Sequence, residues 1–230
     1  MKNIPESLQM IKQRIEAACR RVHRDPKEIE IVAVTKYVSV ETTKAALDHG
    51  VVHLGESRVQ DAIPKWAELG QRGTWHFIGH LQTNKVKDII GRFAYVHSLD
   101  RLSLAAEIEK RGEINNTVTN CFVQVNISGE ETKFGLEPKQ VLEFVKETSK
   151  MKYINLCGLM TMAPYEQEAE ETRTIFKQLR ELRDELNALQ LPRVQLTHLS
   201  MGMSNDFEVA IEEGATFIRL GSVLVGNERK

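Results

Sequence analysis

The sequence has few cysteines and no long apolar run, and these shortages exclude whole classes of protein. Its three cysteines, Cys19, Cys121 and Cys157, are odd in number and far apart. They fit neither a disulfide framework nor paired zinc ligands, so we expect reduced, mostly buried thiols. No apolar run approaches the roughly 18 to 20 residues that span a bilayer, and the first residues lack a signal-peptide core. We therefore expect a cytoplasmic protein with no membrane contact.

An excess of charge of either sign is also missing. Lys and Arg total 31 against 32 Asp and Glu, a formal net charge of −1, so no basic excess recruits nucleic acid or anionic lipid. Hydrophobic residues make up 41% and charged residues 27% of the 230 positions, as in a folded globular chain. No linker, low-complexity tract or repeat divides the chain. We expect one domain over residues 1–230 and, without a large exposed apolar stripe, a monomer.

Eight short apolar runs alternate with stretches of helical periodicity. The runs cover residues 29–36, 51–54, 75–78, 93–96, 121–127, 156–162, 194–199 and 216–220. The helical stretches cover residues 4–22, 40–49, 57–69, 84–90, 101–110, 138–150, 166–189 and 205–213. Parallel strands need crossover helices, and a (β/α)8 barrel is typically about 250 residues long. The pattern predicts a single (β/α)8 TIM-type barrel with an extra N-terminal helix; an open doubly wound sheet is the alternative.

In such a barrel the active face lies at the carboxyl ends of the strands. Polar residues close most of the apolar runs: Lys36, Glu56, His80, Ser98, Asn126, Thr161, Ser200, Gly202, Arg219, Gly221 and Ser222. One polar strand end is ordinary turn chemistry, but their combination marks this face as the candidate site.

The loops after strands seven and eight of these barrels often bind phosphate. Here the first loop contains Ser200, Gly202 and Ser204 and leads into a helix, where we expect Asn205 to be the cap of a capping box. The second loop begins with Gly221 and Ser222, which can bring further backbone N–H donors close. Together the two loops predict a phosphate-binding site, although either alone would pass as a glycine turn before a helix.

Lys36 emerges from a buried strand and therefore needs a reason to be there. Its chain can simply extend to water. Alternatively, its amine lies in a pocket and forms a Schiff base with an aldehyde. A Schiff-base lysine opposite a phosphate site favours pyridoxal 5'-phosphate (PLP). A sugar-phosphate or keto-acid lyase would combine the same two features, so these residues leave the ligand open.

Seven strings distributed in order over nearly the whole chain carry a family resemblance. They are AVTK at 33–36, LGESRVQ at 54–60, WHFIGHLQTNK at 75–85, QVNI at 124–127, GLM at 158–160, LSMGMS at 199–204 and IRLGS at 218–222. Together they resemble the pyridoxal phosphate homeostasis proteins of the YggS/PROSC type, whose barrel is similar to the N-terminal domain of alanine racemase.

The resemblance implies cofactor-binding roles for particular residues. Lys36 would hold PLP as an internal aldimine, and Arg219 would face the pyridine nitrogen. The phosphate would be surrounded by Ser200, Gly202, Ser204, Gly221 and Ser222. One contact does not carry over, because the family's Gly-Glu-Asn string ends here in Ser57, which has a hydroxyl and no amide. Lys133, in the loop after strand five, would contact the phosphate side or accept the cofactor in transit.

The resemblance also implies storage, buffering or delivery of PLP to apoenzymes, and no catalysis. Arg219 would disfavour protonation of the ring nitrogen, which makes the cofactor a weaker electron sink. Racemases of similar fold have a second β domain with a catalytic tyrosine, whereas this sequence ends at Lys230, soon after strand eight. We therefore expect a cofactor-binding protein. The alternatives are a PLP-dependent racemase or lyase and a cofactor-independent Schiff-base aldolase.

His76 and His80 are four residues apart, which on a helix would suit a shared metal ion. The residues between them instead form a strand and a loop start, and no acidic or cysteine partner is near in sequence. We expect no metal site.

Overall fold

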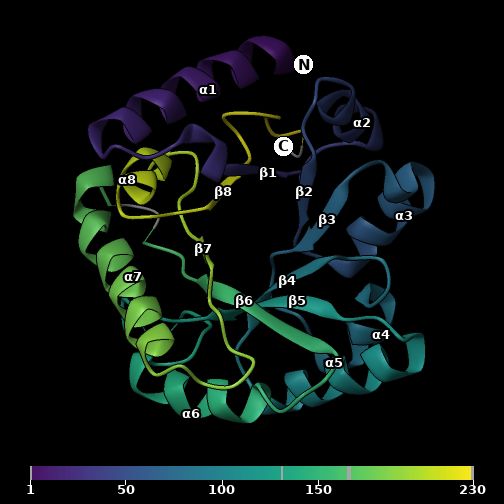
Figure 1. The fold of residues 1–230 in the computed structure, drawn as a ribbon. Helices are drawn as coiled ribbons and strands as arrows, with labels where there is room; N and C mark the ends of the chain where they lie inside the picture. The colour runs from purple at the N-terminus through teal and green to yellow at the C-terminus, as the bar shows by residue number, and fades with distance from the viewer. Residues whose placement is uncertain (1, 131, 165–166, 229–230) are drawn as a thin grey trace.

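The computed structural model describes residues 2–130, 132–164 and 167–228, which form a closed barrel of eight parallel strands surrounded by helices (Figure 1). The strands are β1 (Glu30–Val34), β2 (His53–Glu56), β3 (Thr74–Phe77), β4 (Tyr95–Leu99), β5 (Thr119–Gln124), β6 (Ile154–Met160), β7 (His198–Ser200) and β8 (Phe217–Leu220). The helices are α1 (Ile4–Arg21), α2 (Val40–Asp48), α3 (Val59–Leu69), α4 (Val86–Ile89), α5 (Leu102–Asn115), α6 (Pro138–Thr148), α7 (Arg173–Ala188) and α8 (Phe207–Glu212). The prediction of a (β/α)8 barrel with an extra N-terminal helix is confirmed.

Each strand pairs in parallel with the next along the chain, and β8 returns to β1 to close the barrel. Across this last pair Val32 lies opposite Arg219 and Ala33 opposite Leu220. Because all eight strands run the same way, their carboxyl ends meet at one mouth. The residues that follow β1 and β8 are therefore neighbours in space, although they are far apart in sequence.

The apolar side chains form one large core between the strands and the helices and a smaller one inside the barrel. Alternate residues of a strand point to opposite sides, so Ala33 belongs to the outer core while Val32 belongs to the inner one. Phe122 and Phe217 also belong to the inner core. Buried polar side chains of β3, β4, β7 and β8 share the interior with them, so the barrel has a partly polar centre.

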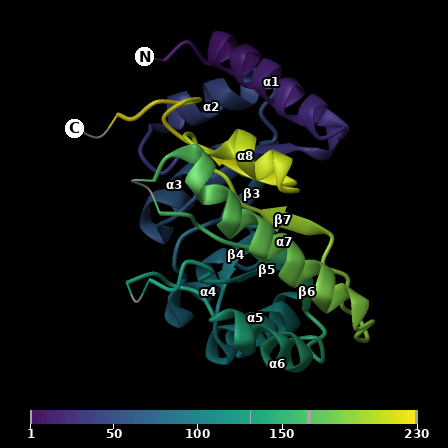
Figure 2. The same cartoon turned by 90° about the vertical axis from the view of Figure 1, so that its left-hand side faces the viewer.

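Helix α1 lies against α8 on the outside of the barrel (Figure 2). It begins where the Asn3 side chain accepts a hydrogen bond from a first-turn N–H at 3.3 Å, next to Pro5, whose fixed φ suits a first helical turn. After the helix, Arg24 donates hydrogen bonds to the carbonyl oxygens of Ile211 and Ala215 at 2.7 and 2.9 Å. These contacts fasten α1 to the end of α8.

The seventh strand is shorter than the apolar run predicted. Only His198–Ser200 forms β7, and residues 194–197 have no regular structure. The reason is a side chain of α7: the Asn187 amide donates to the carbonyl oxygen of Leu196 at 3.0 Å and accepts from its N–H at 2.9 Å. The backbone groups that a sheet would need there are already satisfied.

Helix α5 continues to Asn115, beyond the predicted end at residue 110, and two other predicted helical stretches are interrupted by 3₁₀ turns. The stretch 166–189 becomes a 3₁₀ turn (Ala169–Thr172) followed by α7, with residue 166 outside the described residues. The stretch 84–90 becomes a 3₁₀ turn (Thr83–Lys85) and the single turn of α4. The three cysteines are free and buried, as predicted. Within the described ranges, no helix combines the length and the apolar character needed to cross a membrane.

Candidate functional site

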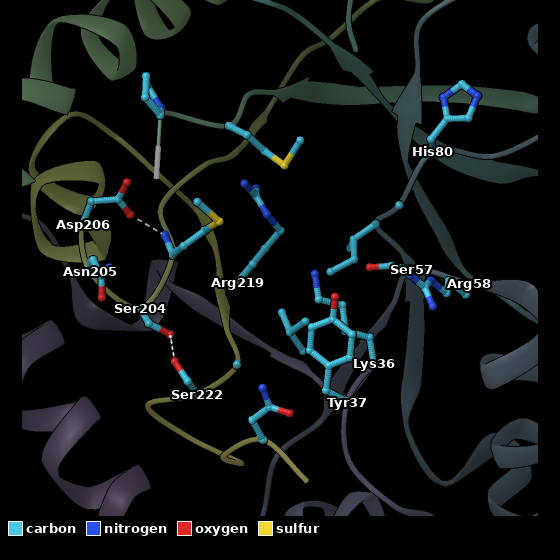
Figure 3. A pocket seen from close by; sticks show the side chains of 18 of the residues that line it. Lys36, Tyr37, Ser57, Arg58, His80, Ser204, Asn205, Asp206, Arg219 and Ser222 are labelled. Atoms are coloured by element: carbon cyan, nitrogen blue, oxygen red, sulfur yellow. Dashed lines mark hydrogen bonds between the residues drawn. The ribbon is translucent and has the colours of Figure 1, made fainter. Parts of the chain in front are cut away.

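A cavity of about 550 Å³ opens at the carboxyl mouth of the barrel. Figure 3 shows side chains from the ends of β1 and β8 and from the loops after β2, β3 and β7 around it. Five of the seven residues predicted to bind the cofactor line it: Lys36, Ser204, Arg219, Gly221 and Ser222. The cavity also receives side chains that sequence reasoning did not single out, among them Tyr37, Arg58, Phe134 and Asp206.

Lys36 lies two residues beyond the end of β1, and its side chain projects into the cavity (Figure 3). Its Nζ lies 5.0 Å from the centre of the Tyr37 ring, within the range of a cation–π contact. No carboxylate of the described residues lies within ion-pair distance of this amine. Lys36 is therefore available to a ligand.

A buried polar cluster supports Lys36 from below. Lys65 of α3 donates from Nζ to Glu56 Oε1 at 2.8 Å and to the carbonyl oxygen of Thr35 at 2.5 Å. The Thr35 hydroxyl donates to the same carboxylate oxygen at 2.6 Å. Glu56, a candidate site residue, is thus fully buried in a structural ion pair away from the cavity lining. Because Thr35 directly precedes Lys36, the cluster fixes the backbone from which the lysine projects.

Arg219 of β8 brings a positive charge to the cavity. Its Nη1 donates to Ser200 Oγ at 2.6 Å and its Nη2 to the carbonyl oxygen of Thr161 at 2.9 Å. Burial lowers the pKa of Arg219 to about 10, with the nearby Asp206 carboxylate acting in the opposite direction. The guanidinium therefore stays charged at neutral pH, and it offers donors only.

Hydroxyl and backbone donors meet on the same side of the cavity. Ser222 Oγ donates to Ser204 Oγ at 3.5 Å, which joins the loops after β7 and β8 (Figure 3). Within the described part of the chain, the backbone N–H groups of Ser204, Asn205 and Ser222 have no hydrogen-bond acceptor. Clustered N–H donors without acceptors are the groups that bind an anion. The donor set therefore fits a phosphate group.

Ser200 and Gly202, predicted for the same site, do not line the cavity. Ser200 is fully buried beneath Arg219. Gly202 has a φ of +91°, and a Cβ there would lie 2.6 Å from the Ala210 Cβ, so only glycine fits this turn. Its carbonyl oxygen accepts a hydrogen bond from the Arg219 N–H at 3.0 Å. Both residues shape the wall behind the cavity; their contact with phosphate stays a prediction.

The helix cap predicted at Asn205 is wrong. The N-cap of α8 is Asp206, and its carboxylate turns back to accept a hydrogen bond from the Met203 N–H at 2.6 Å. Burial raises the pKa of Asp206, against the opposing effects of that hydrogen bond and of Arg219. The Met203 N–H therefore has an acceptor within the protein, whereas the N–H groups of Ser204 and Asn205 are available to a ligand.

The opposite rim of the cavity carries Ser57, Arg58, His80 and Phe134. The rings of His80 and Phe134 are stacked with their centres 4.1 Å apart. Ser57 stands where the family that the sequence resembles has an asparagine, and it lines the cavity. Lys133 does not line the cavity and instead pairs with Glu130 at 2.6 Å. The predicted contact of Lys133 with a cofactor stays a prediction.

His76 and His80 do not converge. His76 is fully buried inside the barrel, whereas His80 lies at the cavity. No group of three or more metal-ligating side chains of the His, Cys, Asp and Glu types occurs among the residues that the structure describes.

Comparison with known proteins places the chain in a family. The family "Alanine racemase, N-terminal domain" matches residues 7–229. A protein of Aquifex aeolicus (strain VF5) named "Pyridoxal phosphate homeostasis protein" is 45% identical over 229 residues, which cover 99% of each chain.

Solved structures agree with this placement. The structure of PipY from Synechococcus elongatus PCC7942 "with PLP bound" is 34% identical, with a TM-score of 0.82, and the match covers 94% of this chain and all of PipY. An alanine racemase of Clostridium difficile 630, 17% identical, shares the fold with a TM-score of 0.74, over 95% of this chain and 56% of the racemase. The predicted resemblance is confirmed: the chain belongs to the pyridoxal phosphate homeostasis protein family, within the larger family of the alanine racemase N-terminal domain.

Proposed function

We propose that this chain is a single PLP-binding barrel domain over residues 1–230 that stores, buffers or delivers the cofactor in the cell, and that it is not an enzyme. The observation that carries the proposal is the meeting of Lys36, Arg219 and a set of free N–H donors at one cavity. The names of the relatives support it, since the Aquifex protein is named for pyridoxal phosphate homeostasis and PipY has PLP bound.

Each part of the cavity has a role in this proposal. When bound, the cofactor supplies an aldehyde carbon that attaches reversibly to a primary amine. Lys36 supplies that amine. Ser204, Gly221 and Ser222 hold the phosphate, with Ser200 and Gly202 behind them, and Arg219 faces the ring nitrogen. The residues in the lining match the charge and the hydrogen-bonding groups of the ligand.

The charge of Arg219 supports the non-catalytic role. A guanidinium that is buried, charged and restricted to donating disfavours a proton on the ring nitrogen it faces. The ring then withdraws electrons poorly, and a substrate carbanion gains less stabilisation. Reversible attachment of the cofactor to Lys36 does not need a stabilised carbanion. Storage and delivery therefore proceed, whereas reactions that form a carbanion on an amino-acid substrate are slowed.

A PLP-dependent racemase or lyase is the competing function, because His80 lies in the cavity lining and an imidazole is a common proton carrier. Deuterium exchange at the α-carbon distinguishes the two. We expect no exchange above that of free PLP with any common amino acid. Rapid exchange with one of them, lost in His80→Phe, would establish an enzyme.

We also propose a cytoplasmic monomer whose partners are PLP and PLP-dependent apoenzymes, without nucleic acid or membrane. The exposed large apolar side chains of the described residues come from separate parts of the chain: Met10, Tyr37, Val52, Leu102, Ile114, Val118, Phe134 and Leu189. Sedimentation of the purified protein tests the monomer, and transfer of PLP to an apoenzyme tests delivery.

The visible absorbance of the protein loaded with PLP tests the proposal. Wild-type protein should carry the band of a lysine-bound cofactor, and Lys36→Ala should lose it with unchanged circular dichroism. Lys87→Ala, which removes an exposed lysine of α4, is the matched control and should keep the band. A Lys36→Ala protein that remained fully coloured would refute the assignment.

A further inference from the structure

Three histidines inside the barrel form a continuous row of hydrogen bonds. His53 of β2 lies with its Nδ1 2.8 Å from His76 Nε2. His76 of β3 lies with its Nδ1 2.9 Å from His97 Nε2. His97 of β4 lies with its Nδ1 2.8 Å from Ser200 Oγ. We call His53, His76, His97 and Ser200 the histidine chain.

Groups of opposite charge stand at the two ends of the histidine chain. At one end the Glu30 carboxylate lies 3.2 Å from His53 Nε2. At the other end Arg219 donates to Ser200 Oγ at 2.6 Å. The histidine chain therefore connects Glu30, the half-exposed first residue of β1, with the Arg219 guanidinium in the cavity.

These ends determine which ring nitrogen carries each proton. A carboxylate only accepts, so His53 Nε2 must donate to Glu30, and the Nδ1 of the neutral ring then accepts from His76 Nε2. The same reasoning makes His97 Nε2 donate to His76. At the other end Arg219 can only donate, so the Ser200 hydroxyl accepts from it and gives its own proton to His97 Nδ1. Every donor and acceptor of the row is used once.

We propose that the histidine chain is a directional clamp that holds the Arg219 guanidinium at the cavity floor, with all three imidazoles neutral and protonated at Nε2. His97 and Ser200 are thereby positioning residues for the ring-nitrogen contact of Arg219. This role rests on the proposed binding of PLP, whereas the proton arrangement can be measured without PLP.

The surroundings of the rings favour this arrangement. Burial lowers the pKa of both His76 and His97 well below the ordinary value, helped by neighbouring histidines and, for His97, by Arg219. His76 is stacked on Tyr95 with centres 4.4 Å apart, and His97 on Phe122 with centres 4.3 Å apart. Neutral rings held between aromatic neighbours keep one orientation. Because a guanidinium does not release its proton, the row ends at Arg219 and holds that side chain in place instead of passing protons to a ligand.

The proton arrangement is tested by nitrogen NMR of wild-type protein labelled with ¹⁵N-histidine, without added PLP. Protonated and unprotonated ring nitrogens differ widely in chemical shift. We expect His53, His76 and His97 each to show a protonated Nε2 and an unprotonated Nδ1 at neutral pH. A protonated Nδ1 on any of the three, or a charged ring, would overturn the proposal.

The positioning role is tested by the affinity for PLP. His97→Leu removes the acceptor of the Ser200 hydroxyl and should raise the Kd for PLP about tenfold, the scale of roughly one hydrogen bond between neutral groups. His97→Asn puts an amide oxygen near the position of Nδ1 and should restore most of the affinity. His198→Leu is the matched control. His198 of β7 is a half-buried histidine of the barrel that is hydrogen-bonded to Thr216 and is not part of the histidine chain.

The outcomes separate the two proposals. Equal losses in His97→Leu and His198→Leu, or no rescue by His97→Asn, would contradict the clamp while leaving the cofactor site intact. Wild-type protein that failed to bind PLP would contradict the proposed function, and the NMR result would still decide the proton arrangement. If His97→Leu does not fold, His97→Phe keeps a ring stacked on Phe122 but offers the Ser200 hydroxyl no acceptor, and it should also raise the Kd.

Discussion

Lys65 and Glu56 form a buried ion pair directly beneath the lysine of the site. Their side chains are 7% and 0% exposed, and Glu56 Oε2 has no hydrogen-bond partner within the described part of the chain. Such a pair adds little net stability compared with apolar residues of the same shape, but losing one partner strands a charge in the interior. The pair therefore matters most as the support of Thr35 and Lys36.

Lys65→Met should lower the free energy of unfolding by about 3 to 5 kcal/mol, because it leaves the Glu56 carboxylate buried without a cation. Chemical denaturation measures the change. Lys139→Met is the control: its pair with Glu137 is 80% and 59% exposed, so the substitution should leave the denaturation curve essentially unchanged. Equal effects of the two substitutions would show that the buried pair has no special role.

At the scale of elements, sequence reasoning predicted most of the barrel but not the contacts between its parts. The eight apolar runs were sufficient because buried parallel strands are nearly continuous in apolar residues. The prediction failed for the first part of the run at 194–199, because a side chain of another element, Asn187, takes the backbone groups of Leu196. Periodicity along the chain contains no sign of such a contact.

The same limit applies to the candidate site. Lys36, Arg219 and the small residues of the last two loops were found because they follow strands, and the barrel brings strand ends together. Lys65 was not singled out, because its partners lie outside its own helix, in β2 and just after β1. His53, His76 and His97 lie in three different strands, so only the closed barrel shows that they touch.

The attachment of α1 to α8 gives a prediction about an element. Arg24→Ala removes both hydrogen bonds to the carbonyl oxygens of Ile211 and Ala215 and should lower the free energy of unfolding by about 1.5 to 3 kcal/mol. Arg20→Ala, an exposed arginine of the same helix end, should change it by less than about 0.5 kcal/mol. Thermal unfolding of the two variants provides the comparison. A stable Arg24→Ala protein would mean that the remaining contacts, apolar packing and the ion pairs of Arg14 with Glu208 and of Arg21 with Glu212, are enough to hold α1.

At the scale of the whole molecule, the buried histidines make stability depend on pH. The pKa values of His76 and His97 lie below their ordinary value of about 6.5. Below pH 6.5 the unfolded chain therefore binds protons that the folded chain refuses. The stability they contribute is complete above pH 6.5 and is lost as the pH falls toward the folded pKa values.

Between pH 6.5 and 5 the free energy of unfolding should fall by up to about 2.7 kcal/mol per pH unit for these two rings. His53 and His198, whose pKa values burial also lowers, add to the slope. Denaturation curves across this range measure the slope. A flat profile would show that the rings take up protons in the folded protein.

Covalent attachment of PLP to Lys36 is the central claim, and borohydride reduction followed by peptide mapping tests it most directly. Reduction fixes the bond between an amine and the cofactor, so the modified residue can be read from the peptide masses. We predict the cofactor's mass on the peptide that contains Lys36, in wild-type protein and in Lys87→Ala alike. A cofactor found on another lysine, or on none, would contradict the account.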